Sequence, residues 1–114
     1  MAFADVQDAL LEAGSGIDSV SVIGGGAQSV LWGRILASAL GRPLVYRRGA
    51  AVGPAVGAAR LARVGVTGTS AEEACPEPPE ERVAEPEPEL VAHFAEQRPR
   101  FRSLYQRVAG LVSK

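Results

Sequence analysis

The sequence predicts an α/β fold in which a small parallel sheet packs against helices. β-Branched residues alternate with serines over 19–23, which indicates a half-buried strand, and a second short apolar run follows at 44–46. Between them, apolar residues recur at helical spacing over 28–40. Because a helical crossover joins parallel strands, we expect the strands at 19–23 and 44–46 to be neighbours in one sheet.

The first helix is predicted over residues 3–13, where Phe3, Val6 and Leu10 lie on one apolar stripe and Gly14 follows as a stop signal. No capping residue precedes the stripe, so we expect it to continue a longer helix and to leave an apolar face exposed. Exposed apolar patches bind partners, and self-association of the chain through this face is expected.

The helix over 28–40 ends at Gly41, and a third helix is predicted over 54–64. Pro54 occupies its first turn, where the missing N–H costs no hydrogen bond. Gly53 and Gly57 are four residues apart, and a glycine inside a helix is usually retained because it lets another backbone approach. This small-residue face is the second place at which we expect self-association.

Residues 65–88 are rich in proline and glutamate, and we interpret them as a solvated connection outside the core. Cys75 is the single cysteine and is expected to be a solvated free thiol. The last helix is predicted over 90–112, with a stripe that keeps its phase across Pro99, which indicates a kinked helix or two abutting helices. His93, beside that stripe, is expected to be a surface residue.

Composition argues against several classes of function. The 114 residues suffice for one domain, and 46% of them are hydrophobic. A net charge of −1 and an aromatic content of 5% argue against nucleic-acid binding. No apolar run approaches the ~18 residues of a membrane helix, and the first residues lack the basic region of a signal peptide. The sequence therefore indicates a cytoplasmic protein.

A glycine-rich turn between the first strand and the next helix is the most informative motif. Its residues are Gly24, Gly25, Gly26, Ala27, Gln28 and Ser29. Glycines let the backbone approach a phosphate, and free N–H groups at a helix N-terminus favour an anion. One alternative is a turn that binds nothing. Another is a dinucleotide site, because Gly24-x-Gly26-x-x-Ser29 approximates that fingerprint and Arg47-Arg48 would then select NADP.

Three motifs in order resemble the C-terminal domain of the sugar kinases of the FGGY family, and most closely its xylulokinases. They are Gly24-Gly25-Gly26-Ala27-Gln28-Ser29-x-x-Trp32, then Leu40-Gly41-Arg42-Pro43-Leu44, then Val52-Gly53-Pro54-Ala55-Val56-Gly57-Ala58-Ala59-Arg60-Leu61-Ala62. The tail also resembles the family's final helix, with Phe94 to Gln97 and then Arg100-Phe101-Arg102-x-Leu104-Tyr105. The chain departs from the family at Ala51, where an acidic residue is frequent, and at Ala37-Ser38, where Ala-Asp is frequent.

The resemblance implies a fragment of an actin/hexokinase-like (ribonuclease H-like) ATPase domain. In this family two domains close over a sugar and ATP, which is used with Mg²⁺. The resemblance assigns Gly25, Gly26 and Ala27 to the nucleotide and Gly24 to the end of the strand. Gln28 and Ser29 would open the helix behind the nucleotide.

The resemblance implies no catalytic residue and no metal ligand in this chain. The family's catalytic aspartate and its sugar-binding residues belong to parts of the protein that are absent here. The aspartates at hand, Asp5, Asp8 and Asp18, match no motif of the family.

The resulting hypothesis is the C-terminal, ATP-binding portion of a kinase that phosphorylates a ketopentose, D-xylulose. Residues 1–66 would hold the nucleotide, 67–89 would be a connection, and 90–114 would form a helix on the same domain. Because the N-terminal domain would bind the sugar, the chain alone is expected to be inactive. The alternative is a free-standing, non-catalytic module that binds a nucleotide or a protein partner.

Overall fold

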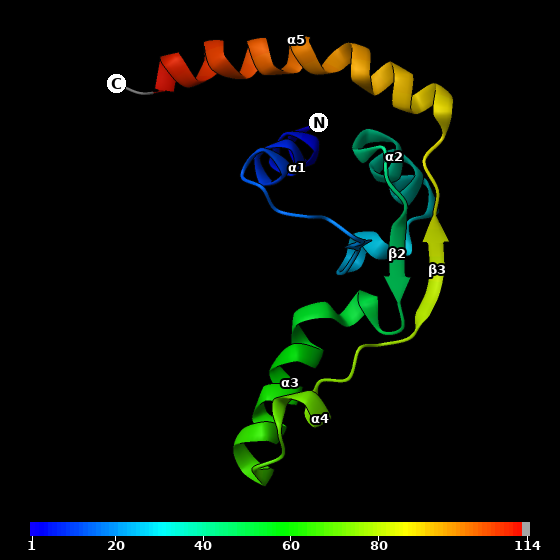
Figure 1. Ribbon diagram of the computed structural model, residues 1–114, viewed down its shortest axis with the longest axis vertical. Helices are drawn as coiled ribbons and strands as arrows, with labels where there is room; N and C mark the ends of the chain where they lie inside the picture. The colour runs from blue at the N-terminus through cyan, green and yellow to red at the C-terminus, as the bar shows by residue number, and fades with distance from the viewer. Residues whose placement is uncertain (113–114) are drawn as a thin grey trace.

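The computed structural model describes residues 1–112 (Figure 1). Its elements are α1 (Ala2–Glu12), β1 (Val20–Ser21), the 3₁₀ turn η1 (Gly25–Gln28), α2 (Val30–Leu40), β2 (Leu44–Arg47), the 3₁₀ turn η2 (Ala50–Val52), α3 (Gly53–Thr67), α4 (Ala71–Ala74), β3 (Glu80–Ala84) and α5 (Pro88–Val112). The predicted helices and both predicted strands are confirmed, with ends that differ by at most three residues. Residues 113 and 114, the end of the predicted unit 90–114, lie outside the described residues.

The strands form one sheet with the order β1-β2-β3. β1 and β2 are parallel, with Val20 opposite Leu44, as predicted. β2 and β3 are antiparallel, with Leu44 opposite Ala84, so the sheet is mixed where a small parallel sheet was expected. The physical reason is the connection between the two strands. After β2 the chain forms α3 and α4 beyond one end of the sheet, and it re-enters the sheet from that same end, so β3 must run in the opposite direction to β2 (Figure 1).

β3 lies within the segment that we interpreted as a connection outside the core, and for residues 80–84 that interpretation is wrong. Ala84 is 8% exposed and belongs to the core. Backbone pairing explains the strand, because β3 pairs along β2 and Arg48 N also donates to Pro79 O at 2.9 Å. An existing strand thus orders a segment that has few apolar residues of its own. Cys75 is an exposed free thiol, as predicted.

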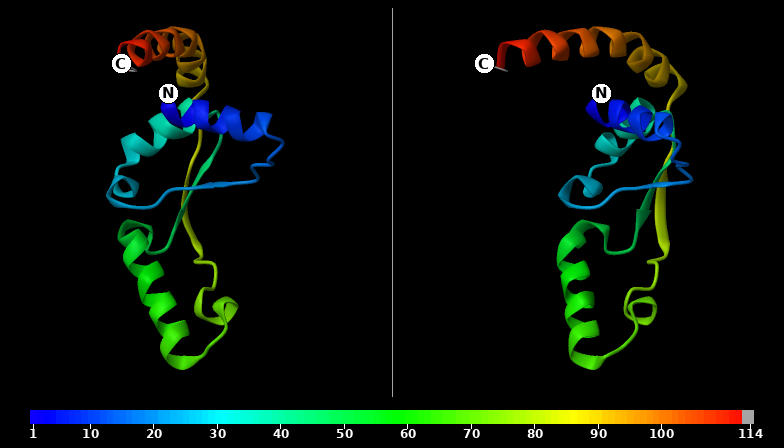
Figure 2. Two further views of the ribbon diagram at one scale, coloured as in Figure 1. Left: turned by 90° about the vertical axis from the view of Figure 1, so that its left-hand side faces the viewer. Right: turned by 60° about the vertical axis from the view of Figure 1, so that its left-hand side comes forward.

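The buried core is small and lies where η1 and α2 pack on β2 and β3. Its members are Ala27, Ala37, Leu44, Tyr46 and Ala84. The Cα radius of gyration is 17.8 Å, whereas a compact domain of this length has about 13 Å. Figures 1 and 2 show the cause: α3 and α4 extend beyond one end of the sheet, and α5 lies over α1 and α2 at the other.

Large apolar side chains are therefore exposed on several helices. The exposed fractions are 62% for Phe3, 58% for Val6, 47% for Leu10 and 68% for Leu61. The first three confirm the exposed apolar face that was predicted for the first helix.

Glycines bring α2 and the glycine turn close to their neighbours. A Cβ at Gly33 would overlap the hydroxyl of Tyr46, so only glycine lets α2 lie this close to β2. A Cβ at Gly53 would lie 3.6 Å from Gly24 N, which is the close backbone approach predicted there. At Gly57, by contrast, a Cβ would have no neighbour within 4 Å among the described residues, so the close approach predicted at this glycine is not found.

α5 continues through Pro99 as one curved helix, which excludes two abutting helices (Figure 1). His93 is exposed, as predicted. The last helix packs against α2 at its start, where Glu87 N donates to Ser38 Oγ at 3.0 Å and the Glu87 carboxylate pairs with Arg34. These contacts join the end of the chain to the helix that follows the glycine turn.

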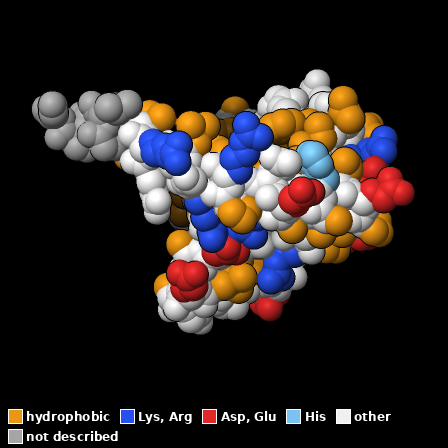
Figure 3. Space-filling view, turned by 90° about the horizontal axis from the view of Figure 1, so that it is seen from above, with side chains coloured by type: hydrophobic (Ala, Val, Ile, Leu, Met, Phe, Trp, Pro, Cys, Tyr) orange, Lys and Arg blue, Asp and Glu red, His pale blue; other side chains and the backbone are white. Residues whose placement is uncertain are grey.

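Ion pairs connect the middle of α5 to α1. Arg102 Nη2 and Arg98 Nη2 lie 2.7 Å and 2.5 Å from Asp8 Oδ2, and Arg102 Nε lies 2.6 Å from Asp5 Oδ1. Seen from above (Figure 3), basic and acidic side chains gather on this face among apolar ones. The hydrogen bond from Arg102, followed by the charge of Arg98, holds the pKa of Asp8 below its ordinary value of 3.8.

The contact between Gly33 and Tyr46 predicts opposite effects of one substitution at two helical glycines. Gly33→Ala should lower the stability, because overpacking of about 1–3 kcal/mol exceeds the gain of up to about 1 kcal/mol in helix propensity. Gly57→Ala should raise the stability by the gain in helix propensity, because its Cβ has no neighbour to overlap among the described residues. Urea unfolding followed by circular dichroism measures both changes. Equal effects of the two substitutions would contradict the packing described for α2.

The lowered pKa of Asp8 predicts an acid-sensitive contact between α1 and α5. A lowered pKa in the folded state contributes stability above the ordinary value, which is lost as the pH falls through 3.8 and below. Asp8→Asn should therefore reduce the melting temperature at pH 7, and this reduction should shrink as the pH falls below 3.8. The control is Asp18→Asn at an exposed site; a pH-independent difference for Asp8→Asn would contradict the prediction.

Candidate functional site

The candidate site lies at the carboxyl ends of the parallel strands. η1 follows β1 and η2 follows β2, so parallel pairing brings the two turns to the same edge of the sheet, where α/β sheets bind ligands. Gly24 N donates to Ala50 O at 2.7 Å, which joins the turns directly. Gly24 has a φ of 91°, a conformation that favours glycine.

The predicted turn residues are brought together, but in a different local structure from the one expected. Gly25 to Gln28 form the 3₁₀ turn η1, and α2 begins at Val30 rather than at Gln28. Ser29 is the N-cap, whose Oγ accepts a hydrogen bond from Trp32 N at 3.1 Å. This side-chain acceptor sets the start of α2 and leaves Gln28 in the turn.

The two glycines inside η1 differ in what they contact. A Cβ at Gly25 would have no neighbour within 4 Å among the described residues, and its φ is not positive. A Cβ at Gly26 would lie 3.3 Å from Trp32 Cδ1. The first N–H groups of such a turn have no acceptor within it. Gly25 therefore leaves polar backbone open to approach from outside, while Gly26 is packed against α2.

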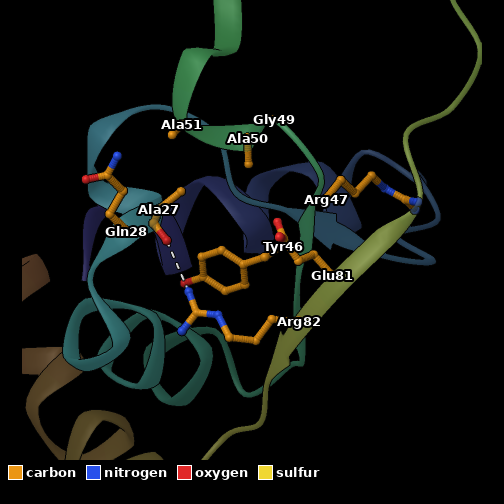
Figure 4. A pocket seen from close by; sticks show the side chains of 9 residues that line it. All are labelled: Ala27, Gln28, Tyr46, Arg47, Gly49, Ala50, Ala51, Glu81 and Arg82. Atoms are coloured by element: carbon orange, nitrogen blue, oxygen red, sulfur yellow. Dashed lines mark hydrogen bonds between the residues drawn. The ribbon is translucent and has the colours of Figure 1, made fainter.

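A cavity of about 500 Å³ opens beside the turn (Figure 4). Its lining residues are Ala27, Gln28, Tyr46, Arg47, Gly49, Ala50, Ala51, Glu81 and Arg82. Two of these, Ala27 and Gln28, belong to the predicted site. The other walls come from β2, from the loop that contains η2, and from β3. The cavity combines apolar walls with the amide of Gln28, the guanidinium groups of Arg47 and Arg82 and the carboxylate of Glu81, a mixture of apolar and polar groups that is typical of a ligand site.

Sequence reasoning missed the contribution of β3. Arg82 Nη2 donates to Ala27 O at 3.0 Å, and its guanidinium carbon lies 3.9 Å from the centre of the Tyr46 ring. Tyr46 and Arg82 are cross-strand partners. The available signal was the stretch Glu80–Ala84, in which charged residues give way to Val83 and Ala84 between prolines.

Arg47, the first of the two arginines in the NADP alternative, is engaged within the chain. Arg47 Nη2 lies 2.7 Å from Glu77 Oε1, and Arg47 Nη1 donates to Pro78 O at 3.0 Å. This side chain is thus engaged by residues that precede β3. Its charge is matched within the chain, which leaves no strong reason for it to bind a ribose phosphate.

Within residues 1–112, no three side chains among His, Cys, Asp and Glu converge as a metal site would require. Over the same residues, every helix is too short or too polar to cross a bilayer.

The comparisons with known proteins agree with one another. The C-terminal domain of the FGGY family of carbohydrate kinases matches residues 1–66. The xylulose kinase of Escherichia coli (strain K12) is 40% identical over 98% of this chain and 23% of the relative. The xylulose kinase of Klebsiella pneumoniae is 36% identical over the same shares. The crystal structure of a xyloylose kinase from Brucella ovis superposes with a TM-score of 0.71 at 33% identity, over 95% of this chain and 23% of that one.

The fold is accordingly that of the actin/hexokinase-like sugar kinases. The chain belongs to the FGGY family of carbohydrate kinases, and its residues 1–66 match the family's C-terminal domain. It spans 23% of the length of the curated relatives that it matches. Membership of this family overturns the NADP alternative.

Proposed function

We propose that this chain is the C-terminal, nucleotide-binding part of an ATP-dependent kinase that phosphorylates the ketopentose D-xylulose. The observation that carries the proposal is the glycine turn at the carboxyl edge of the sheet, with its open Gly25 backbone. The similarity to two xylulose kinases over 98% of the chain supports the choice of sugar.

The six residues Gly24 to Ser29 are the proposed nucleotide site. Gly25, Gly26 and Ala27 would line the ATP phosphates and ribose, and Gln28 lines the adjoining cavity. Mg²⁺ would neutralise the charge of the phosphates during transfer, held by ATP and by residues elsewhere in the kinase. The catalytic base and the sugar site are likewise proposed to lie in the N-terminal domain.

The proposed division of the chain follows from this assignment. Residues 1–66 would form the nucleotide-binding part, 67–89 the connection that includes β3, and 90–114 the helix that packs on the same domain. A cytoplasmic location fits a kinase that consumes ATP. The partners would be ATP and a sugar, with no nucleic acid and no membrane.

The alternative of a free-standing module receives less support, because Phe3 and Leu10 are 62% and 47% exposed instead of buried within the chain. A domain that functions alone would cover such side chains. The same exposure supports the proposal that the isolated chain self-associates through α1, because the rest of the proposed kinase, which would cover this face, is not part of the chain.

Gly25→Val tests the nucleotide site. The Cβ of the added side chain would have no neighbour within 4 Å among the described residues, but the side chain would occupy the approach to the backbone, so ATP binding should weaken at least tenfold with little change in the melting temperature. Calorimetric titration with ATP and Mg²⁺ measures the affinity. Gly26→Val is the poorer test, because its Cβ would lie 3.3 Å from Trp32 Cδ1, so a loss of ATP binding could come from a disturbed fold. Unchanged affinity in Gly25→Val would remove the turn from the site.

Phosphoryl transfer by the 114 residues alone should be undetectable. One glycine turn supplies part of the positioning of ATP but no base for the sugar hydroxyl. A coupled ADP-release assay with D-xylulose checks this, with E. coli xylulose kinase as the positive control. Turnover by the purified chain, free of host kinase, would place the base among its own residues.

A further inference from the structure

Arg82 differs from the other residues around the glycine turn in its place in the sequence. It lies outside residues 1–66, the part matched by the family's C-terminal domain, and yet it contacts the turn. Its strand, β3, pairs with β2, and the pairing sets Arg82 opposite Tyr46. The contribution of Arg82 to the site therefore comes from a residue that is not part of the glycine motif.

Two contacts fix the guanidinium group of Arg82. One face lies on the Tyr46 ring, 3.9 Å from its centre, and Nη2 donates to Ala27 O at 3.0 Å (Figure 4). Tyr46 is itself immobilised, because it is 3% exposed and its hydroxyl abuts α2 at Gly33. An arginine supported in this way loses little further freedom when it forms a hydrogen bond.

The acceptor of that hydrogen bond lies inside η1. Ala27 is 6% exposed, and its N–H is already bonded to Gly24 O at 3.0 Å. With its carbonyl held by Arg82 as well, the peptide groups on both sides of Ala27 are fixed. One of the hydrogen bonds that hold the turn is therefore donated by a side chain of β3.

The charge of Arg82 is also not matched by a carboxylate within the described residues, where its hydrogen bond to Ala27 O and its contact with Tyr46 are the interactions found. Arg82 lines the cavity beside the turn. A guanidinium group has five N–H donors, so others remain after one donates to Ala27 O.

We propose that Arg82 is a positioning residue for nucleotide binding, which holds the glycine turn in its binding conformation through the carbonyl of Ala27 while Tyr46 supports the guanidinium group. The inference rests on the proposed function, because it takes the turn to be the ATP site. It adds a wall and a polar anchor from β3 that the glycine motif does not contain.

The test compares three variants of the complete chain. Arg82→Met keeps an unbranched apolar stem on the Tyr46 ring but removes the donor, and Arg82→Lys keeps a donor and the charge. Arg100→Met removes an arginine from an exposed site on α5 that is not part of the cavity. For each variant we would measure the affinity for ATP with Mg²⁺ by calorimetry, and the backbone amide resonances of residues 25–28 by NMR without nucleotide.

The expected result is a loss of affinity of at least fivefold in Arg82→Met, of which Arg82→Lys recovers more than half. Arg100→Met should be unchanged. The amide resonances of residues 25–28 should move in Arg82→Met and not in Arg100→Met. A purely structural role would lower the melting temperature of Arg82→Met without this local pattern and without rescue by lysine. If Arg82→Met did not fold, Arg82→Lys would serve as the test. The lysine ammonium group cannot reproduce the planar contact of the guanidinium group with the Tyr46 ring, so the amide resonances of residues 25–28 should move in this variant as well.

Gly25→Val, measured in parallel, separates the two proposals. If Gly25→Val weakens ATP binding and Arg82→Met does not, the inference about Arg82 fails and the proposed function survives. If neither variant changes ATP binding, the glycine turn is not the nucleotide site, and the positioning role for nucleotide fails with it. Unmoved resonances of residues 25–28 in Arg82→Met would overturn the inference whatever the affinities.

Discussion

Parallel pairing of β1 with β2 is the constraint on which the site depends. The helix between them, α2, carries the chain back along the sheet, so that both strands end at the same edge. The turns that follow, η1 and η2, then meet, and Gly24 N can reach Ala50 O. A shift of β1 by one residue would turn Val20 away from the core and separate these turns. The geometry of the glycine turn is thus a consequence of strand register as much as of its own residues.

Glycine has a different physical role at each of several positions around this edge. Gly24 adopts a positive φ that other residues rarely adopt, and Gly33 makes room for the Tyr46 hydroxyl. Gly25 needs neither, since its φ is ordinary and its surroundings are open. The fold therefore explains the first two glycines, and the proposed nucleotide explains the third. This difference identifies Gly25 as the position at which function can be separated from folding.

The elongated shape follows from how little the chain buries. Most core members are small, and α1 and α5 pack on α2, while α3 packs on α4 and η2, rather than on the sheet. Large apolar side chains on α1 and α3 remain exposed as a result. Relatives about four times as long contain further polypeptide, which in the proposed kinase would cover these faces. The ion pairs between α1 and α5 connect these two helices, which bury few apolar side chains against each other.

The sequence by itself determined the local elements and the family. Helical spacing, stop signals and the glycine motif depend on neighbouring residues, so the four longer helices, the parallel strand pair and the turn Gly24–Ser29 could be predicted, whereas the short helix α4 was not. The tertiary structure decided the third strand, the 3₁₀ form of the turn and the contact of Arg82 with Ala27 O. Residues 80–84 have too weak an apolar pattern to indicate a strand, because they become one by pairing with β2, a partner more than thirty residues earlier in the chain.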